Sequence, residues 1–335
     1  MAARVRIVIP TLRSGPLLSA CLASLARQTF RDFEVVVVLN GLGPEPLQTP
    51  PLTGLRWVRA PVNWGFGRAI NEGAAGADAE FIVALNDDTV ADSAWLEEMV
   101  AALERRPEAG MAAPVIVRSF DQRIDSAGMA LARDGSSKQR GAGQDPERFA
   151  HDEPVLFASG CAAIYRRHAL DQVGGFDPEF FLYCEDTDLG LRLQRAGWSC
   201  WLAARARIEH HYSATGGAAS PRKVYFAERN RLAVAVKNLP WEWCAGALPW
   251  SMVRYFWHGV YLFQRRGYPG QPGSAPIPAA RLLRAVAQAH ADFLTWLPRL
   301  LAARKRIAAH SAWSSSEWRA LLRQHQITLR EVARA

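Results

Sequence analysis

The sequence predicts an α/β protein with a three-layer, mostly parallel sheet, followed by a helical C-terminal region. Short apolar segments alternate with helix-like segments over residues 5–117. The segment FEVVVVL at 33–39 is apolar without interruption, which is typical of a strand buried on both faces. From residue 222 onward, long helical patterns rich in arginine and aromatic residues replace this alternation. Alternation of this kind indicates a parallel sheet covered by helices.

The strands and helices of the first part follow one another in turn. Each strand is a short apolar run, and the first helix, 15–28, has leucine and alanine residues at helical spacing. Pro10 ends the first strand, and Pro107 follows the last helix of this series. The expected strands are 5–9, 33–39, 54–60, 79–86 and 112–117, and the expected helices are 15–28, 65–77 and 92–106.

Residues 118–152 are polar and rich in glycine, in contrast to the segments on either side. Such a composition favours a loop, and we expect it to be a mobile loop over a site. The next segment, 154–167, is apolar and is expected to return to the core.

Composition limits the class of protein. Of the 335 residues, 49% are apolar and 21% are charged, which is a normal globular balance. Five cysteines form no CxxC pair, which argues against a disulfide framework and a zinc site and fits a reducing compartment. The apolar run near the N-terminus is too short for a signal peptide, so we expect a cytoplasmic protein.

Charge divides the chain into two expected domains, 1–221 and 222–335. The first carries 22 Lys and Arg against 27 Asp and Glu, a net charge of −5. The second carries 18 against 5, a net charge of +13. A basic C-terminal region suggests an anionic partner, either a phospholipid surface or nucleic acid.

The C-terminal region is expected to be helical at 241–268 and at 279–310, with a break at Pro298. Its longest stretch without a charged residue is 243–253, well short of the roughly 20 residues that span a bilayer. Aromatic residues mixed with arginines suit the membrane–water interface. A helical appendage that packs on the core or forms a homodimer is the alternative. Nucleic acid is disfavoured, because the tryptophans lie among aliphatic residues and not on a polar stacking surface.

Two adjacent acids follow the expected strand 79–86, in the sequence LNDDT. Asn86, Asp87 and Asp88 would then lie at the carboxyl end of a sheet strand, where α/β proteins place their sites. Paired carboxylates provide an oxygen-rich site for Mg²⁺ or Mn²⁺. A turn whose acids cap the next helix is an equally good interpretation of these residues alone.

The segment NWGFGRAINEG at 63–73 follows one strand and opens a helix. Its glycines at 65 and 67 would allow a ligand close to the backbone, and Arg68 would meet phosphate oxygens. It matches neither GxGxxG nor a P-loop. A glycine-rich turn between strand and helix explains it about equally well.

A pair of histidines follows the apolar approach in IEHHYSATGG at 208–217. The imidazole of His210 or His211 would complete a carboxylate metal site. Taken alone, a histidine pair is more often structural or exposed.

Three carboxylates, Glu185, Asp186 and Asp188, lie in the otherwise apolar run FFLYCEDTDLGLRLQRAGW at 180–198. They are expected at the start of a short helix that ends at Gly197. Capping explains one acid, worth about 0.5–2 kcal/mol, but not three. A carboxylate against aromatic surfaces has a raised pKa and suits a general base.

Taken together, these segments resemble family 2 glycosyltransferases of the GT-A fold, in particular the rhamnosyltransferase-like members that act on bacterial surface glycans. The segment GGFDPEFFLYCEDTDLGLRLQRAGW carries the most specific likeness, to the acceptor and catalytic-base segment. LNDDT lies where that family has its DXD-type metal motif, and HHYSATGG lies in the place of its late metal-site histidine. The likeness covers residues 4–237.

The resemblance implies an inverting transfer of a sugar, with rhamnose as a candidate, from a nucleotide-diphosphate donor held on Mg²⁺ or Mn²⁺. Asp186 would be the general base, with Glu185 and Asp188 orienting the acceptor or the base. Asp88 would bind the metal with His210 as its partner, and Asn86 and Asp87 would contact nucleotide or metal. The other candidate nucleotide contacts are Pro10, Thr11, Asn40, Asn63, Gly67 and Asn71.

Two departures from the family pattern bear on the donor and the metal. Leu39 stands where the family has an acid that reads the pyrimidine base, and Asn40 follows it, which leaves a dTDP-sugar and a UDP-sugar both open. The DXD-type motif begins with Asn86, so Asp88 is expected to carry more of the metal binding.

The resemblance also implies an acceptor and a location. A glycan or a lipid-linked glycan would be the acceptor, used at the inner face of the plasma membrane by a peripheral protein. QxxRW and spanning helices are absent from the sequence, which favours single addition over processive synthesis. A non-catalytic membrane-associated protein that keeps the GT-A fold is the alternative function.

Overall fold

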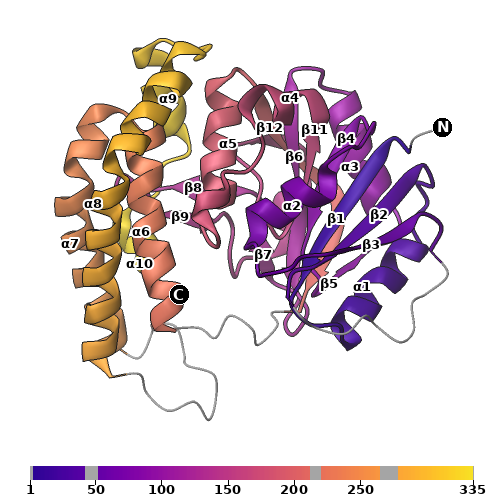
Figure 1. Ribbon diagram of the computed structural model, residues 1–335, viewed down its shortest axis with the longest axis horizontal. Helices are drawn as coiled ribbons and strands as arrows, with labels where there is room; N and C mark the ends of the chain where they lie inside the picture. The colour runs from indigo at the N-terminus through magenta and orange to yellow at the C-terminus, as the bar shows by residue number, and fades with distance from the viewer. Residues whose placement is uncertain (1–2, 42–51, 212–219, 265–277, 335) are drawn as a thin grey trace.

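A mixed ten-stranded sheet forms the centre of the molecule (Figure 1), in the order β10-β12-β6-β11-β4-β1-β2-β3, with β5 beside β12 and β7 beside β6. The computed structural model describes residues 3–41, 52–211, 220–264 and 278–334. The strands are β1 Val5–Thr11, β2 Phe33–Leu39, β3 Leu55–Arg59, β4 Phe81–Leu85, β5 Thr89–Ala91, β6 Ala109–Arg118, β7 Ile124–Ser126, β8 Met129–Leu131, β9 Ser137–Gln139, β10 Glu153–Val155, β11 Ala162–Arg166 and β12 Ser199–His210.

The central strands confirm the expected direction of the sheet. β1, β2, β3, β4, β6 and β12 run the same way, whereas β11 lies antiparallel between β4 and β6. Strands β5, β7 and β10 also run against the main direction. The parallel strands β1, β2 and β4 are buried over nearly their whole length, as their continuous apolar sequences require.

Helices cover both faces of the sheet, which makes three layers. The helices are α1 Pro16–Ala26, α2 Phe66–Ala74, α3 Trp95–Glu104, α4 Arg167–Val173, α5 Glu185–Arg195, α6 Pro221–Asn238, α7 Trp241–Phe263, α8 Ala279–Ala309, α9 Ser315–Gln324 and α10 Leu329–Ala333. One buried core joins α1 and α3 to the sheet. A second core joins α2, α4, α5 and α6 to the opposite face.

The C-terminal helices stand beside the sheet as a layer of their own, with α6, α7 and α8 side by side (Figure 1). Helix α6 lies between α5 and α8, and its second half, from Glu228 to Asn238, is buried throughout. The second core continues from Leu189 through Leu232 to Trp318, across the predicted boundary at 221/222. The division into two domains there remains a prediction.

Two expectations about local structure are wrong. Residues 118–152 do not form a loop without structure of its own, because they contain β7, β8 and β9, and apolar side chains of β7 and β8 reach the core. Helix α8 runs through Pro298 without a break. Pro298 and Leu294, four residues earlier, are both exposed, so water reaches the carbonyl that proline leaves without its usual donor.

No helix in the described parts of the chain combines the length and the apolar character needed to cross a membrane.

Candidate active site

A cavity of about 390 Å³ opens at the carboxyl ends of β1, β2 and β4. Its floor comes from the residues directly after these strands, and its rim comes from the loop before α5 and from the start of α6. Of the expected site residues, it is lined by Pro10, Thr11, Asn40, Asn63, Asn86, Asp87 and Asp88. Parallel strands that end at one edge bring these distant segments together.

Asp87 lies on the floor of this cavity and is held by Thr11. The Thr11 hydroxyl donates to Asp87 Oδ2 over 2.5 Å, which links the ends of β1 and β4. Burial raises the pKa of Asp87 to about 6, although the Thr11 hydrogen bond opposes this shift. A positive charge nearby would lower the pKa of Asp87 and favour the ionised carboxylate.

Asn40 shapes the cavity wall through the backbone of residues 64 and 65. Its side chain accepts from Trp64 N over 2.7 Å and donates to Gly65 O over 2.8 Å. Gly65 has a φ of 75°, and a Cβ there would lie 2.1 Å from the carbonyl oxygen of Phe181. Only glycine therefore allows the segment before α2 to pass so close to the loop before α5.

Sheet pairing brings Asp88 and His210 together. Strand β12 pairs with β5 so that His210 is opposite Thr89, the residue after Asp88. His211 N also donates to Asp88 O over 2.8 Å. As a result, His210 Nε2 lies 3.3 Å from Asp88 Oδ1, with both side chains nearly buried.

A third residue, Asp125, orients the imidazole. Its Oδ2 lies 2.8 Å from His210 Nδ1. Asp125 is the extra residue of a bulge in β7, since Ile124 is opposite Val117 and Ser126 is opposite Ile116. Bulges of this kind redirect a side chain, often beside an active site. A carboxylate on the far nitrogen is the usual support of a metal-binding histidine.

The donor set of Asp88 and His210 suits a divalent cation with few protein ligands. Two neighbouring ligands of an octahedral Mg²⁺ with bonds of about 2.1 Å lie about 3 Å apart. The separation of 3.3 Å between Asp88 Oδ1 and His210 Nε2 is close to this value. Among the described residues, no group of three or more His, Cys, Asp and Glu side chains is arranged to hold a metal ion. A metal here would thus keep most of its positions for other ligands.

The neighbours of His210 determine the charge of its imidazole. Burial by itself would lower the pKa of His210, but Cys161 and the carboxylates of Asp125 and Asp88 outweigh burial and raise it. The imidazole is therefore a protonated bridge between two acids when nothing else neutralises them.

Asp186 lies in the first turn of α5 and does not itself line the cavity. Its Oδ2 accepts from Gly160 N over 2.9 Å, and its Oδ1 accepts from Thr187 N over 2.6 Å. Phe66, which lines the cavity, packs against the same Gly160. Burial raises the pKa of Asp186, and these hydrogen bonds limit the rise.

The loop before α5 has an unusual backbone. Phe181, Tyr183 and Cys184 all have positive φ values of 61° to 67°, a conformation that side chains disfavour. Asn230, fully buried on α6, donates to three carbonyl oxygens of this loop, those of Phe180, Leu182 and Tyr183, over 2.7–2.9 Å. One amide thus holds the strained loop that presents Phe181 and Tyr183 to the cavity.

Glu185 and Asp188 occupy different surroundings from Asp186. Glu185 is buried, its Oε2 has no hydrogen-bond partner among the described residues, and burial raises its pKa to about 8 with a further contribution from Asp186. Asp188 is fully buried and lies 2.8 Å from both Arg192 Nε and Lys237 Nζ. Burial would raise the pKa of Asp188, but these cations outweigh it and lower it to about 2.

Seven expected site residues are not among the described residues that line the cavity: Glu185, Asp186 and His210, described above, and Asp188, Gly67, Asn71 and Arg68. Asp188 connects α5 to α6 through Lys237 and Asn238. Gly67 makes room for Phe176, whose Cβ would lie 2.9 Å from an added Cβ. Asn71 binds the backbone N–H and carbonyl of Phe176 over 3.0 and 2.7 Å. Arg68 is exposed and pairs with Glu72.

Sequence reasoning missed Asp125, Asn230, Arg222 and Lys223. Arg222 and Lys223 line the cavity from the first turn of α6, where Ser220 caps the helix by accepting from Lys223 N. The sequence SPRK carries a helix-start signal that would have placed these two cations at a helix N-terminus. Asp125 and Asn230 carry no local signal, since only tertiary contacts give them partners. Residues 212–217 of the expected histidine segment lie outside the described residues.

Comparison with known proteins yields a family and several relatives. Residues 6–174 match the family described as glycosyl transferase family 2. The chain is 28% identical over 271 residues to N-acetylglucosaminyl-diphospho-decaprenol L-rhamnosyltransferase of Mycobacterium tuberculosis. The matched region covers 73% of this chain and 88% of the relative. It is 31% identical over 229 residues to the O-antigen biosynthesis protein RfbC of Myxococcus xanthus, covering 63% of this chain but only 18% of RfbC.

Solved structures with the same fold are more distant in sequence. GalNAc-T7 with UDP, GalNAc and Mn²⁺ has a TM-score of 0.58 at 14% identity, covering 92% of this chain and 59% of that one. Staphylococcus aureus TarS has a TM-score of 0.52 at 17% identity, covering 96% of this chain and 55% of that one. At these identities the likeness supports the GT-A fold alone.

Proposed function

This chain belongs to glycosyl transferase family 2 and is a glycosyltransferase, and from that premise we propose that it performs an inverting, metal-dependent transfer. The donor is a nucleotide-diphosphate sugar, with rhamnose as the first candidate because of the rhamnosyltransferase relative. The acceptor is a glycan or lipid-linked glycan of cell-surface polysaccharide synthesis. The observation that carries this proposal is the pairing of Asp88, which lines the cavity, with His210 over 3.3 Å, together with Asp186 on Gly160, against which Phe66 of the cavity wall also packs.

The donor occupies the 390 Å³ cavity, with its nucleoside toward the ends of β1 and β2. Thr11, Asn40 and Asn63 line this part and offer neutral hydrogen-bonding groups. The diphosphate lies toward Asp88 and the first turn of α6, where Arg222 and Lys223 provide positive charge at a helix N-terminus. Calorimetry with dTDP-rhamnose and with UDP-sugars distinguishes a thymine base from a uracil base.

Asp88 and His210 would hold a Mg²⁺ or Mn²⁺ ion, with Asp125 orienting the imidazole. Mg²⁺ sites commonly use one or two protein ligands and take the remainder from substrate phosphates and water. When bound, the cation supplies positive charge that stabilises the departing nucleoside diphosphate.

Asp186 is the general base. It takes the proton from the acceptor hydroxyl while the hydroxyl oxygen forms a bond to the anomeric carbon of the donor. The bond from that carbon to the diphosphate oxygen breaks on the opposite face, which inverts the configuration. A raised pKa suits this role, because a more basic carboxylate accepts the proton more readily near neutral pH.

The test of this proposal separates binding from chemistry. Asp186→Asn is expected to lower transfer by about 10²-fold or more, because the amide cannot accept the proton. Binding of the donor, measured by calorimetry with dTDP-rhamnose and UDP-sugars in the presence of Mn²⁺, is expected to stay within about twofold of the wild type. Asp88→Asn is the matched variant, in which metal-dependent donor binding should be lost.

Retained transfer by Asp186→Asn would contradict the assignment of the base. Donor binding that is the same with Mn²⁺ and with a chelator would contradict the metal site. Configuration of the product at the anomeric carbon, determined by NMR, tests inversion on its own.

We further propose that the protein is peripheral at the inner face of the plasma membrane, through the outer face of α7. This face consists of Trp241, Leu248, Met252, Phe256 and Phe263, which are 52–92% exposed and recur at helical spacing. Exposed Arg281 and Arg284 follow at the start of α8, at the end of the molecule where α7 finishes (Figure 1). An apolar helix face beside arginines fits an anionic bilayer surface.

Vesicle flotation tests this surface. Met252→Glu and Phe256→Glu are expected to reduce flotation with phosphatidylglycerol vesicles, because each places a charge in the apolar contact. Phe120→Glu changes an exposed aromatic residue of the sheet-containing part and serves as control. Unchanged flotation of the α7 variants would contradict the membrane proposal. A dimer that dissociates in these variants, seen by light scattering, would assign the face to a homodimer instead.

A further inference from the structure

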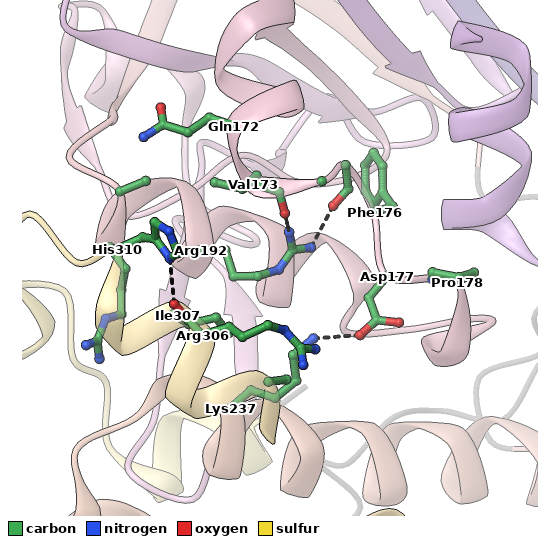
Figure 2. A pocket seen from close by; sticks show the side chains of 15 residues that line it. Gln172, Val173, Phe176, Asp177, Pro178, Arg192, Lys237, Arg306, Ile307 and His310 are labelled. Atoms are coloured by element: carbon green, nitrogen blue, oxygen red, sulfur yellow. Dashed lines mark hydrogen bonds and ion pairs between the residues drawn. The ribbon is translucent and has the colours of Figure 1, made fainter. Parts of the chain in front are cut away.

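A second cavity, of about 330 Å³, lies between the body of the protein and α8 (Figure 2). Its walls are the segment 172–178 after α4, the last turn of α5, Lys237 of α6 and the last turns of α8. It shares no lining residue with the donor cavity, whose described walls come from other segments. The glycosyl transfer proposed above makes no use of it.

Positive charge dominates the walls of this cavity. Arg192, Arg195, Lys237 and Arg306 all line it. Against these four cations stand one lining carboxylate, Asp177, and the buried Asp188 behind it. Two positive charges thus remain without a matching carboxylate at the cavity.

Part of this positive charge stabilises helix ends and carboxylates of the protein. Three helices, α4, α5 and α8, end at the cavity, and cations are favoured at helix C-termini. Arg192 donates to the carbonyl oxygens of Val173 and Gly175, each over 2.8 Å, and pairs with Asp188. Lys237 Nζ lies 2.7 Å from Asp177 Oδ2 and 2.8 Å from Asp188 Oδ1.

Arg195 and Arg306 are not explained in this way. The buried Nε of Arg195 has no hydrogen-bond partner among the described residues, and its guanidinium stacks on the ring of Trp318. Arg306 forms no ion pair or side-chain hydrogen bond within the described chain. Its side chain extends from α8 toward Lys237 and Asp177 (Figure 2). Lys237 is already paired with Asp177 and Asp188, so Arg306 is the cation here that remains for an added anion.

We propose that this cavity binds a molecule through a phosphate group, with Arg306 as its main contact. Guanidinium and ammonium groups are the usual partners of phosphate oxygens, and Arg306 provides the planar donors that fit them. Phe176, Pro178 and Ile307 line the rest of the cavity and give an apolar surface to the remainder of the ligand. The volume exceeds that of inorganic phosphate, so a phosphorylated small molecule or a phospholipid headgroup is the class of ligand.

The probe for the first experiment is inorganic phosphate. Its binding is measured by calorimetry and by thermal stabilisation, each against chloride at equal ionic strength. Arg306→Gln is expected to weaken phosphate binding about tenfold, the loss of a charge-assisted contact. Lys305→Gln is the matched control, since Lys305 is the exposed cation next along α8 and does not line the cavity. Equal binding of phosphate by Arg306→Gln and wild type would overturn the proposal.

The second experiment distinguishes the source of the phosphate. Phosphatidylglycerol vesicles that bind the wild type and Lys305→Gln but not Arg306→Gln would identify a lipid headgroup. Glycerol 3-phosphate that binds with the same dependence on Arg306, together with unchanged vesicle binding, would identify a soluble ligand. Stabilisation by phosphate that follows ionic strength alone in all three proteins would overturn the site altogether.

Discussion

Glu185, Asp186 and Asp188 lie within one turn of α5, yet each carboxylate has a different environment. Asp188 is neutralised by Arg192 and Lys237 and stays ionised, whereas Glu185 is buried without such a partner. Asp186 lies between these extremes, since it accepts hydrogen bonds from two backbone N–H groups but has no cation as a partner. Neighbouring acids with separated pKa values are typical of sites where one of them moves a proton.

Glu185 makes stability depend on pH. Its pKa is raised by folding from an ordinary value near 4.5 to about 8, so the folded state holds a proton that the unfolded state has lost between these values. Stability from this group is therefore complete below about pH 4.5 and decreases as pH rises toward 8.

Replacement of Glu185 by glutamine should remove this decrease in stability at higher pH. Glu185→Gln is expected to raise the melting temperature by several degrees at pH 8 and to change it little at pH 4.5, because glutamine keeps the neutral form at all pH values. Melting curves across this range measure the difference between variant and wild type. A constant difference at every pH would contradict the assignment of the titration to Glu185.

At the scale of elements, the loop 180–184 connects the cavity wall to α5, which carries Asp186. It contributes cavity wall through Phe181 and Tyr183, leads into α5, and is held from α6 by Asn230. Backbone conformations of this kind persist only where the surrounding structure enforces them. Helix α6, which the sequence placed in a separate C-terminal region, is thus part of the site.

Asn230→Ala is expected to loosen this loop. Three carbonyl oxygens lose their donor, which should lower stability by about 1–3 kcal/mol in denaturant unfolding. Because Asp186 follows the loop directly, kcat should fall by about tenfold or more while the KM for the donor changes less.

Asn230→Asp is the comparison variant, since aspartate has the same shape but no N–H group to donate. It should behave like the alanine variant in both measurements. Full activity of Asn230→Asp would show that the amide does not hold the loop.

At the scale of the whole molecule, buried ion pairs fasten the C-terminal helices to the body. Arg254 of α7 lies 2.7 Å from Asp134, in the turn after β8, and 2.6 Å from Glu228 of α6. All three are at least 94% buried, and Arg231 completes the cluster. The sequence pattern alone suggested an arginine at a membrane surface, whereas Arg254 faces inward.

Arg254→Met is expected to lower the free energy of unfolding by about 3–5 kcal/mol at neutral pH, because two buried carboxylates then share Arg231 as their one remaining cation. Arg299→Met is the control, since Arg299 is exposed and its pair with Glu179 is worth less than about 1 kcal/mol. Urea unfolding compares the two. Equal, small effects would show that the buried cluster does not hold α7 to the body.

Much of the fold and about half of the expected site could be predicted from local pattern. The apolar runs of β1, β2 and β4 indicate parallel strands, and acids directly after such a strand indicate the cavity that Asp87 and Asp88 line. The sequence alone does not show why residue 67 is glycine, because close approach of a neighbouring side chain and close approach of a ligand both require a residue without a side chain. In the structure, Gly67 makes room for Phe176.

The sequence by itself determined the alternation of strand and helix, the polar edge of the sheet and the start of α5, because these depend on periodicity and on neighbours along the chain. Only the tertiary structure decided which carboxylate is neutralised, which histidine nitrogen faces Asp125, and that α6 supports the site. These features depend on partners 50 to 85 residues away, such as Asn238 for Asp188 and Asp125 for His210, and on the loss of water around them. Burial and long-range contact set the charge of a group, and no local pattern records either.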